Sequence, residues 1–145
     1  MSEYIGCFMC EDPMFTGKEG LFVQKIADLR VSTAILNRDW QFFEGSALLV
    51  YREHITELHH LDSTARDLFM DDACRLAYAL EQAYPGVKLN HGLFGNTVPH
   101  LHWHIIVRRM TDPDPRSTIW ESPFDLLQPS DQDFISTAEH IRQYL

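Results

Sequence analysis

The chain has 145 residues, which is the size of one ordinary domain, and we expect residues 1–145 to form a single unit. Hydrophobic residues make up 45% of it, enough for a real core, but no run of about 18 apolar residues indicates a membrane span. A net charge of −9 argues against a nucleic acid polymer as partner, because such binding needs a basic surface. Three cysteines, an odd number, and no signal-peptide pattern favour a reducing cytoplasm without a disulfide framework.

A Cys-x-x-Cys pair, Cys7 and Cys10, lies near the start of the chain. Such a pair can be half of a zinc site, a redox pair or two ordinary thiols. A redox pair would need a strand followed by a helix, whereas residues 13–20 read as a loop because they contain a proline and two glycines. Zinc and ordinary thiols both stay open at this point.

Strands and a long helix are predicted next. Apolar and β-branched residues favour strands over residues 21–27, 31–37 and 47–51, the first two joined by a tight turn. Residues 64–84 carry apolar side chains at helical spacing, with Asp62 or Ser63 as the capping residue. Cys74 lies beside this apolar stripe, and we expect it to pack there.

The most informative stretch is residues 96–109, NTVPHLHWHIIVRR. His100, His102 and His104 alternate with apolar residues, and strict alternation is the period of a strand. A strand beginning at Pro99 would therefore carry three imidazoles in one row and an apolar row behind them. A metal face, a catalytic face or chance could produce this row, but three polar side chains on one strand face usually have a function.

A strand is also predicted over residues 87–94, interrupted at residues 90–92 and antiparallel to the histidine strand. The antiparallel arrangement is expected because Gly95 and Asn96 form a turn signal between two apolar runs. His59 and His60, farther upstream, read as surface residues.

The last part of the chain is predicted to be a loop followed by a helix. Three prolines follow Arg109, so we expect irregular structure there. Trp120 lies in this loop; packing in the interior is the default expectation, and stacking on a base is the alternative. Ser130 and Asp133 form a start signal for a final helix.

Three stretches of the sequence resemble one known family. HLHWHII resembles the histidine-triad (HIT) signature, His-φ-His-φ-His-φ-φ with φ apolar. LNHGLFGNTVP resembles the segment before the triad in that family, and ALLVYREHITEL resembles its second conserved block. The similarity extends from about Cys7 to about Trp120, and Val107 departs from the proline often found there. The bacterial nucleotide hydrolases of the family, such as diadenosine tetraphosphate hydrolases, are the nearest type.

The resemblance implies an α+β fold, with an antiparallel sheet of about five strands, a central helix and a C-terminal helix. It also implies a homodimer whose two sheets meet edge to edge. The implied reaction is transfer or hydrolysis at the α-phosphorus of a nucleotide derivative. A histidine at the third triad position, His104, favours a hydrolase, because the nucleotidyltransferase branch carries glutamine there. Dinucleoside polyphosphates, nucleoside phosphoramidates and adenylylsulfate are all candidate substrates.

The resemblance also assigns residues. His102, the middle histidine, would be the nucleophile that forms a nucleotidyl-histidine intermediate, and His104 would protonate the leaving oxygen. His100 completes the catalytic triad of histidines. Nucleotide and phosphate contacts would come from four polar residues: Asn37, Asn90, Asn96 and Thr97.

A structural zinc ion is implied as well. Many bacterial HIT proteins hold zinc with the cysteine pair, the histidine of the second block and the first triad histidine, which here are Cys7, Cys10, His54 and His100. If His100 binds zinc, it cannot contact phosphate with the same nitrogen. The chemistry itself would need no cofactor.

Two other functions remain possible from the sequence. One is a metalloenzyme that holds its metal on the three triad histidines, with a coordination position open to water. The other is a nucleotide-binding sensor without turnover.

Overall fold

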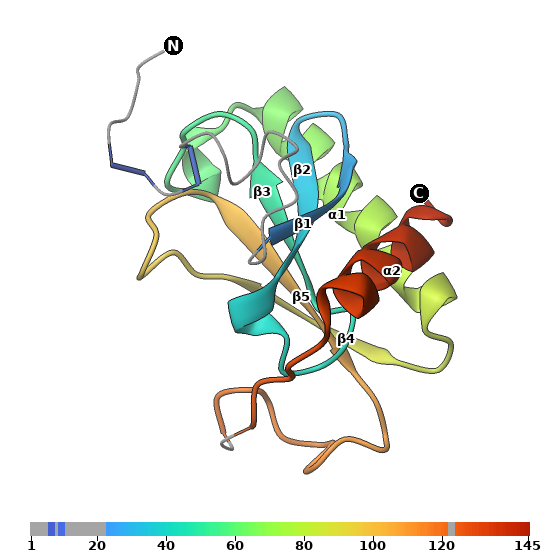
Figure 1. Cartoon of the computed structure of the whole chain (residues 1–145). Coiled ribbons are helices and arrows are strands. Elements are labelled where there is room, and N and C mark those ends of the chain that lie inside the picture. The colour runs from blue at the N-terminus through green and yellow to red at the C-terminus, as the bar shows by residue number, and fades with distance from the viewer. Residues whose placement is uncertain (1–5, 8, 11–22, 122–123) are drawn as a thin grey trace.

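The computed structural model describes residues 6–7, 9–10, 23–121 and 124–145 (Figure 1). The predicted loop at 13–20 and residues 21–22 of the first predicted strand lie outside the described residues. In chain order the elements are β1 Val23–Asp28, β2 Ser32–Asn37, the 3₁₀ turn Arg38–Trp40, β3 Ala47–Tyr51, the 3₁₀ turn Leu58–His60, α1 Ser63–Ala83, β4 Lys88–Leu93, β5 His102–Arg108 and α2 Asp131–Arg142. Among these helices, none has the length and apolar character needed to cross a membrane.

The five strands form one antiparallel sheet in the order β1-β2-β3-β5-β4, and both helices pack on the same face of it (Figure 1). This confirms the predicted α+β fold. Alternate residues of the central strands, such as Leu49 and Ile105, join side chains of α1 and α2 in the main core. Their neighbours point to the opposite face, as the pleat of a strand requires. Every residue of β3 is buried because both faces of the sheet are covered there.

Two sequence predictions about the histidine strand and its partner are wrong in detail. β4 is not interrupted: Asn90 pairs with Ile106 and Gly92 with His104, and this cross-strand pairing outweighs the low strand propensity of Asn and Gly. β5 begins at His102 rather than at Pro99. The connection from β4 is therefore longer than a tight turn, although Gly95 in it does adopt a positive φ of 109°.

The helix starts agree with the predicted caps. The Asp62 carboxylate accepts a hydrogen bond from the backbone N–H of Ala65 at 2.8 Å, and the Ser130 hydroxyl accepts one from the N–H of Asp133 at 3.1 Å. Cys74, in contrast, is exposed on α1, so the expectation that it packs in the interior is wrong.

A buried carboxylate fastens the β1–β2 turn to α1. Asp72 is 0% exposed, and its carboxylate accepts hydrogen bonds from the backbone N–H groups of Arg30 at 3.1 Å and Val31 at 2.9 Å. It also accepts one from the hydroxyl of Ser32 at 2.6 Å. Because a buried carboxylate is costly unless its lone pairs are used, these three bonds are what allow Asp72 to lie inside.

We predict that Asp72→Ala lowers the free energy of unfolding by about 3–5 kcal/mol, because it leaves three donors without their acceptor in the interior. Asp71→Ala is the matched control: Asp71 is exposed and forms an ion pair with Arg30, which is worth about 1 kcal/mol or less. Urea unfolding followed by circular dichroism measures both variants. Equal stability of the two variants would contradict this role for Asp72.

Candidate active site

Two of the three triad histidines lie side by side on the face of the sheet opposite the helices. His102 pairs with Val50 of β3 and His104 with Leu48, so both are in the centre of the sheet. Their ring centroids are 4.9 Å apart, and both side chains are buried. Trp103, Ile105 and Val107 pack on the other face, in or against the main core. The predicted alternation of an imidazole row and an apolar row is confirmed over this strand.

The backbone determines which nitrogen of His102 carries the proton. Nδ1 of His102 lies 2.5 Å from the carbonyl oxygen of His100. A carbonyl oxygen can only accept, so Nδ1 must be the protonated nitrogen of the neutral ring. Nε2 then keeps its lone pair, and the His102 side chain lines a cavity. The sequence left open whether a carbonyl or a carboxylate holds this ring, and the structure identifies a carbonyl.

The His100 ring, just before β5, has a different set of partners. Its Nε2 donates to the carbonyl oxygen of Tyr51 at 2.7 Å. Its Nδ1 therefore carries a lone pair and lies 3.6 Å from Sγ of Cys7 and 3.3 Å from Sγ of Cys10. His100 is not among the described residues that line the cavity with His102. This placement favours the metal-ligand prediction for His100 over the prediction of a phosphate contact.

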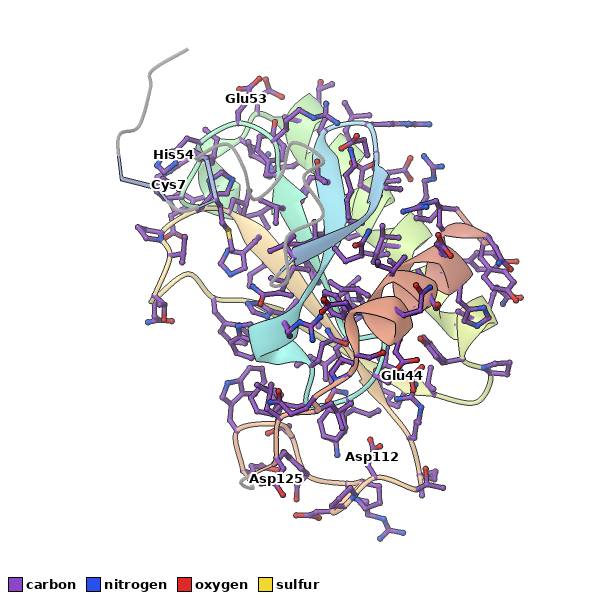
Figure 2. The ribbon with its side chains drawn as sticks, in the orientation of Figure 1. Cys7, Glu44, Glu53, His54, Asp112 and Asp125 are labelled. Atoms are coloured by element: carbon purple, nitrogen blue, oxygen red, sulfur yellow. The ribbon has the colours of Figure 1, made fainter. Side chains whose placement is uncertain are left out.

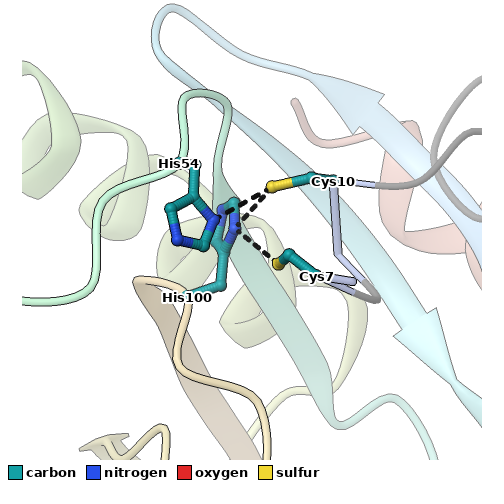
Figure 3. Close-up of side chains that lie close together, drawn as sticks. All are labelled: Cys7, Cys10, His54 and His100. Carbon is teal, nitrogen blue, oxygen red and sulfur yellow. Dashed lines mark hydrogen bonds between the residues drawn. The ribbon is translucent and has the colours of Figure 1, made fainter. Parts of the chain in front are cut away.

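The four predicted metal ligands converge in space (Figure 3). Cys7, Cys10, His54 and His100 come from three separate segments, yet their ligand atoms all lie within 4.8 Å of one another. Sγ of Cys10 is 3.1 Å from Nδ1 of His54. A tetrahedral zinc site with Cys and His ligands has its donor atoms about 3.3–3.8 Å apart. The donor set therefore fits a metal such as zinc.

A cavity of about 510 Å³ opens over His102 and His104. On the β2–β3 side its floor is apolar, with Ile35 and Leu48 in the same row as His104. Asn37, at the end of β2, also lines the cavity. A volume of several hundred cubic ångströms with few polar groups is typical of a small-molecule site.

Polar residues of the loop before β5 form another wall of the cavity. Asn96 and Thr97 line it, and both are exposed. Asn90 does not: it lies beside Ile106, one step farther along the triad face from His104, and is absent from the lining. The structure thus brings Asn37, Asn96 and Thr97 together with the histidines and leaves Asn90 outside this group.

The remaining wall is aromatic, and the sequence indicated it only in part. The ring centroids of Trp40 and Phe94 lie 4.6 and 5.4 Å from that of His104, and Trp120 lies 4.7 Å from Phe94. Trp120 is 55% exposed, so the expectation of a packing tryptophan is wrong. Gly92 makes room for this wall, because a Cβ there would lie 2.2 Å from the Phe94 ring. In the sequence, the alternative that Trp120 stacks on a base was the signal for this wall.

Burial sets the charge of the two cavity histidines. Desolvation lowers the pKa of His104 to about 4, with a smaller contribution from the neighbouring His102. Desolvation also lowers the pKa of His102, while the hydrogen bond to the His100 carbonyl acts in the opposite direction. Both rings are therefore neutral at pH 7, which is the state in which an imidazole nitrogen can attack an electrophile.

Comparisons with known proteins agree with this geometry. The chain matches the HIT domain family over residues 24–111, which is more than half of its length. A search of curated proteins finds no match.

Solved structures with the same fold are similar as well. A histidine triad protein from Sinorhizobium meliloti matches with a TM-score of 0.71 at 23% identity, over 85% of this chain and 90% of that one. A zinc-bound histidine triad family protein from Mycobacterium smegmatis matches with a TM-score of 0.60 at 19% identity, over 83% and 81%. Diadenosine triphosphate hydrolase from Plasmodium falciparum, in complex with cyclomarin A, matches with a TM-score of 0.61 at 18% identity, over 83% and 74%. The chain belongs to the histidine triad (HIT) family.

Proposed function

We propose that the protein is a nucleotide phosphohydrolase that acts at the α-phosphorus of nucleotide derivatives through a nucleotidyl-histidine intermediate on His102. One observation carries the proposal. The carbonyl of His100 holds the proton on Nδ1 of His102, which leaves the lone pair of Nε2 available at the cavity. The match to the HIT family and the fold-level likeness to a diadenosine triphosphate hydrolase support the same class of reaction.

The reaction proceeds in two displacements. Nε2 of His102 attacks the α-phosphorus in line, so that a P–N bond forms while the bond to the leaving group breaks. Water then attacks the phosphorus, the P–N bond breaks, and a nucleoside monophosphate is released. Asn96, Thr97 and the backbone amides after Gly95 donate to the phosphate oxygens, and Asn37 contacts the ribose. The proposed contact of Asn90 with the phosphate region would need a movement toward the cavity.

His104 is proposed to protonate the leaving group. It is neutral in the free protein, with a pKa of about 4. A bound polyphosphate places negative charge beside the ring, and a nearby opposite charge raises a histidine pKa. Substrate binding itself would then supply His104 with the proton that the leaving oxygen needs. Dinucleoside polyphosphates, nucleoside phosphoramidates and adenylylsulfate all fit this scheme.

A metal held by the three triad histidines is disfavoured. Such a site needs three imidazole nitrogens directed at one point. Both nitrogens of His100 have partners elsewhere, at the Tyr51 carbonyl and at the cysteines. One nitrogen of His102 is occupied by a carbonyl oxygen.

We predict that His102→Ala loses about 10³-fold or more in turnover while it still binds nucleotide, because the nucleophile is lost and the phosphate donors remain. His104→Ala should lose less with substrates that have good leaving groups. Steady-state kinetics and equilibrium binding measure these effects, with the exposed His59→Ala as control.

Quenching at neutral pH with labelled substrate should place the label on His102 in the wild-type protein. Label on His100 or His104, or wild-type turnover in His102→Ala, would refute the assignment. Nucleotide binding by the wild-type protein without any turnover over hours would indicate a sensor instead.

We also propose one structural zinc ion per chain, held by Cys7, Cys10, His54 and His100. The spacing of the four donor atoms supports it, as does the carbonyl of Tyr51, which fixes the ring of His100 with Nδ1 toward the thiols. A zinc-thiolate site requires reduced cysteines, which is consistent with the cytoplasmic location that we propose.

We predict one equivalent of zinc by elemental analysis of untagged protein. Cys7→Ser should lower the melting temperature more than it lowers kcat, because a structural zinc contributes folding energy. Cys74→Ser, at an exposed cysteine outside the cluster, should change neither quantity. Substoichiometric metal after growth with added zinc would contradict the proposal.

A homodimer is the proposed assembly, with pairing at the free edge of the sheet. The two edge strands are β1 and β4. Arg142 of α2 donates to backbone carbonyls of Lys25 and Ile26 in β1, whereas no strand in the described part of the chain pairs with the outer edge of β4. An open edge of this kind favours pairing with a second copy.

Light scattering at micromolar concentration should therefore give about twice the chain mass of 16.9 kDa. A mass equal to that of a single chain would contradict this assembly.

A further inference from the structure

A second cavity lies on the helix side of the sheet, away from the triad histidines. It has a volume of about 570 Å³, and its walls come from the β2–β3 connection, the residue after α1, the segment before α2 and α2 itself. Within the described part of the chain it shares no lining residue with the histidine cavity. Figure 2 shows Glu44, one of its lining residues, beside α2 and far from Cys7 and His54. The proposed hydrolase reaction uses none of the residues that line it.

The fold holds the walls of this second cavity in place. The backbone N–H of Leu127 donates to the carbonyl of Gln41 at 2.8 Å, which ties the segment before α2 to the β2–β3 connection. The ring of Tyr84 packs directly on Gly45, where a Cβ would lie 2.3 Å from it. Gly45 has a positive φ of 87°, which glycine adopts without strain. Segments far apart in the sequence are therefore joined around the cavity by specific contacts.

Gln41 directs an unused acceptor into the second cavity. Its side chain lines the cavity although the residue is only 2% exposed. Nε2 donates to the carbonyl oxygens of Ser46 at 2.6 Å and Asn37 at 3.4 Å, which determines the orientation of the amide. No described group donates to Oε1, and no fully enclosed side-chain oxygen or nitrogen of the described residues lacks a partner. Oε1 is therefore open to the cavity, where a ligand can donate to it.

Two more acceptors line the second cavity. Nε2 of His140 donates to the carbonyl of Ala83 at 2.9 Å, so Nδ1 keeps the lone pair of the neutral ring. The carboxylate of Glu44 accepts from the Tyr84 hydroxyl at 3.4 Å, a long bond that leaves most of its accepting capacity unused. Burial raises the pKa of Tyr84, so this hydroxyl keeps its proton. His140 and Glu44 therefore add a ring nitrogen and a carboxylate to the amide oxygen of Gln41.

The charge at the second cavity is negative. Glu44 and Asp133 both line it, whereas none of its described lining residues is a lysine or an arginine. Two arginines lie nearby with partners of their own. Arg38 forms an ion pair with Asp131 at 2.7 Å, and Arg109 donates to the backbone carbonyl of Glu44 at 2.9 Å. A phosphate or carboxylate ligand would be repelled by the two lining carboxylates, so the site favours a cation.

The acceptors and the apolar part of the lining point to one class of cation. An alkylammonium group carries three N–H donors and no acceptor, which complements an amide oxygen, a carboxylate and an imidazole nitrogen. Leu127, Pro129 and Phe134 also line the cavity and offer contact to methylene groups. A hydrated metal ion would make no use of this apolar surface. A chain of methylene groups that carries several ammonium groups uses both parts of the lining.

We propose that the second cavity binds an aliphatic polyamine, with ammonium groups at Gln41, Glu44 and His140 and methylene groups against Leu127 and Phe134. The inference goes beyond the proposed hydrolase function and does not depend on it, because the two cavities share no described lining residue.

Spermidine is the probe, and calorimetric titration of the purified protein is the measurement. The comparison ligand is 1,8-octanediol, which has a chain of the same length and no charge. A buffer at about pH 8 keeps histidines neutral, and salt at about 0.15 M screens the overall negative charge of the chain. We expect one spermidine per chain to bind with saturation, and the diol to give no heat of binding.

Two pairs of variants locate the site. Ser136 is exposed and lines the cavity, so Ser136→Trp should fill it and abolish binding, whereas Ser136→Ala should bind like the wild type. Glu44→Gln keeps the shape of the side chain but removes its charge, and should weaken spermidine binding about fivefold or more. Asp67→Asn removes the same charge from an exposed residue near the start of α1, whereas Tyr84 follows the end of that helix, and should change the affinity by less than about twofold.

Each of these comparisons can overturn the proposal. Equal weakening by Glu44→Gln and Asp67→Asn would mean that spermidine binds only as a diffuse counter-ion. Wild-type affinity in Ser136→Trp, with the circular dichroism spectrum of a folded protein, would place spermidine elsewhere; if that variant does not fold, the Glu44 and Asp67 pair decides. Binding of the diol as tightly as spermidine, or no binding of spermidine, would also refute an amine site. Because no catalysis is measured, these outcomes leave the proposed hydrolase function untouched.

Discussion

The hydrogen bond between Nδ1 of His102 and the carbonyl oxygen of His100 is the contact on which the site depends. It determines which nitrogen of His102 can react, because the carbonyl accepts the only ring proton. The ring of the same residue, His100, contacts the Tyr51 carbonyl and the two cysteines. One residue therefore connects the proposed metal-ligand cluster to the proposed nucleophile, through its ring to the first and its backbone carbonyl to the second.

The sheet makes this arrangement possible because one of its faces packs against the helices and the other lines the cavity. One face packs on both helices in a continuous apolar core. The other carries His102 and His104 at the centre of the sheet, where burial lowers their pKa values and keeps them neutral. A neutral imidazole is a better nucleophile than a protonated one, so the burial that costs the histidines their charge also keeps them in the state that the proposed reaction requires.

Two connections between elements are held by buried charged side chains that form hydrogen bonds with backbone groups. Asp72 fastens a turn at one edge of the sheet, and Arg108 fastens the loop after β5. In both cases a buried charge is satisfied by several backbone groups, which makes the local conformation costly to change. Both connections are thereby fixed in the molecule, and the second of them carries Trp120 of the aromatic wall.

Local pattern was sufficient for most of the elements, whereas the proposed metal-ligand set came from the resemblance to the HIT family. Alternation identified the histidine strand, helical spacing identified α1 and α2, and the two caps at Asp62 and Ser130 lie where predicted. These features depend on residues within a few positions of one another, which is why they can be read from the chain. The unbroken course of β4, the separation of His100 from His102 and His104, and the meeting of Phe94 with Trp120 depend on contacts between distant segments. Backbone pairing overrides strand propensity in β4, and whether a tryptophan is buried or lines a cavity depends on which residues the fold brings against it.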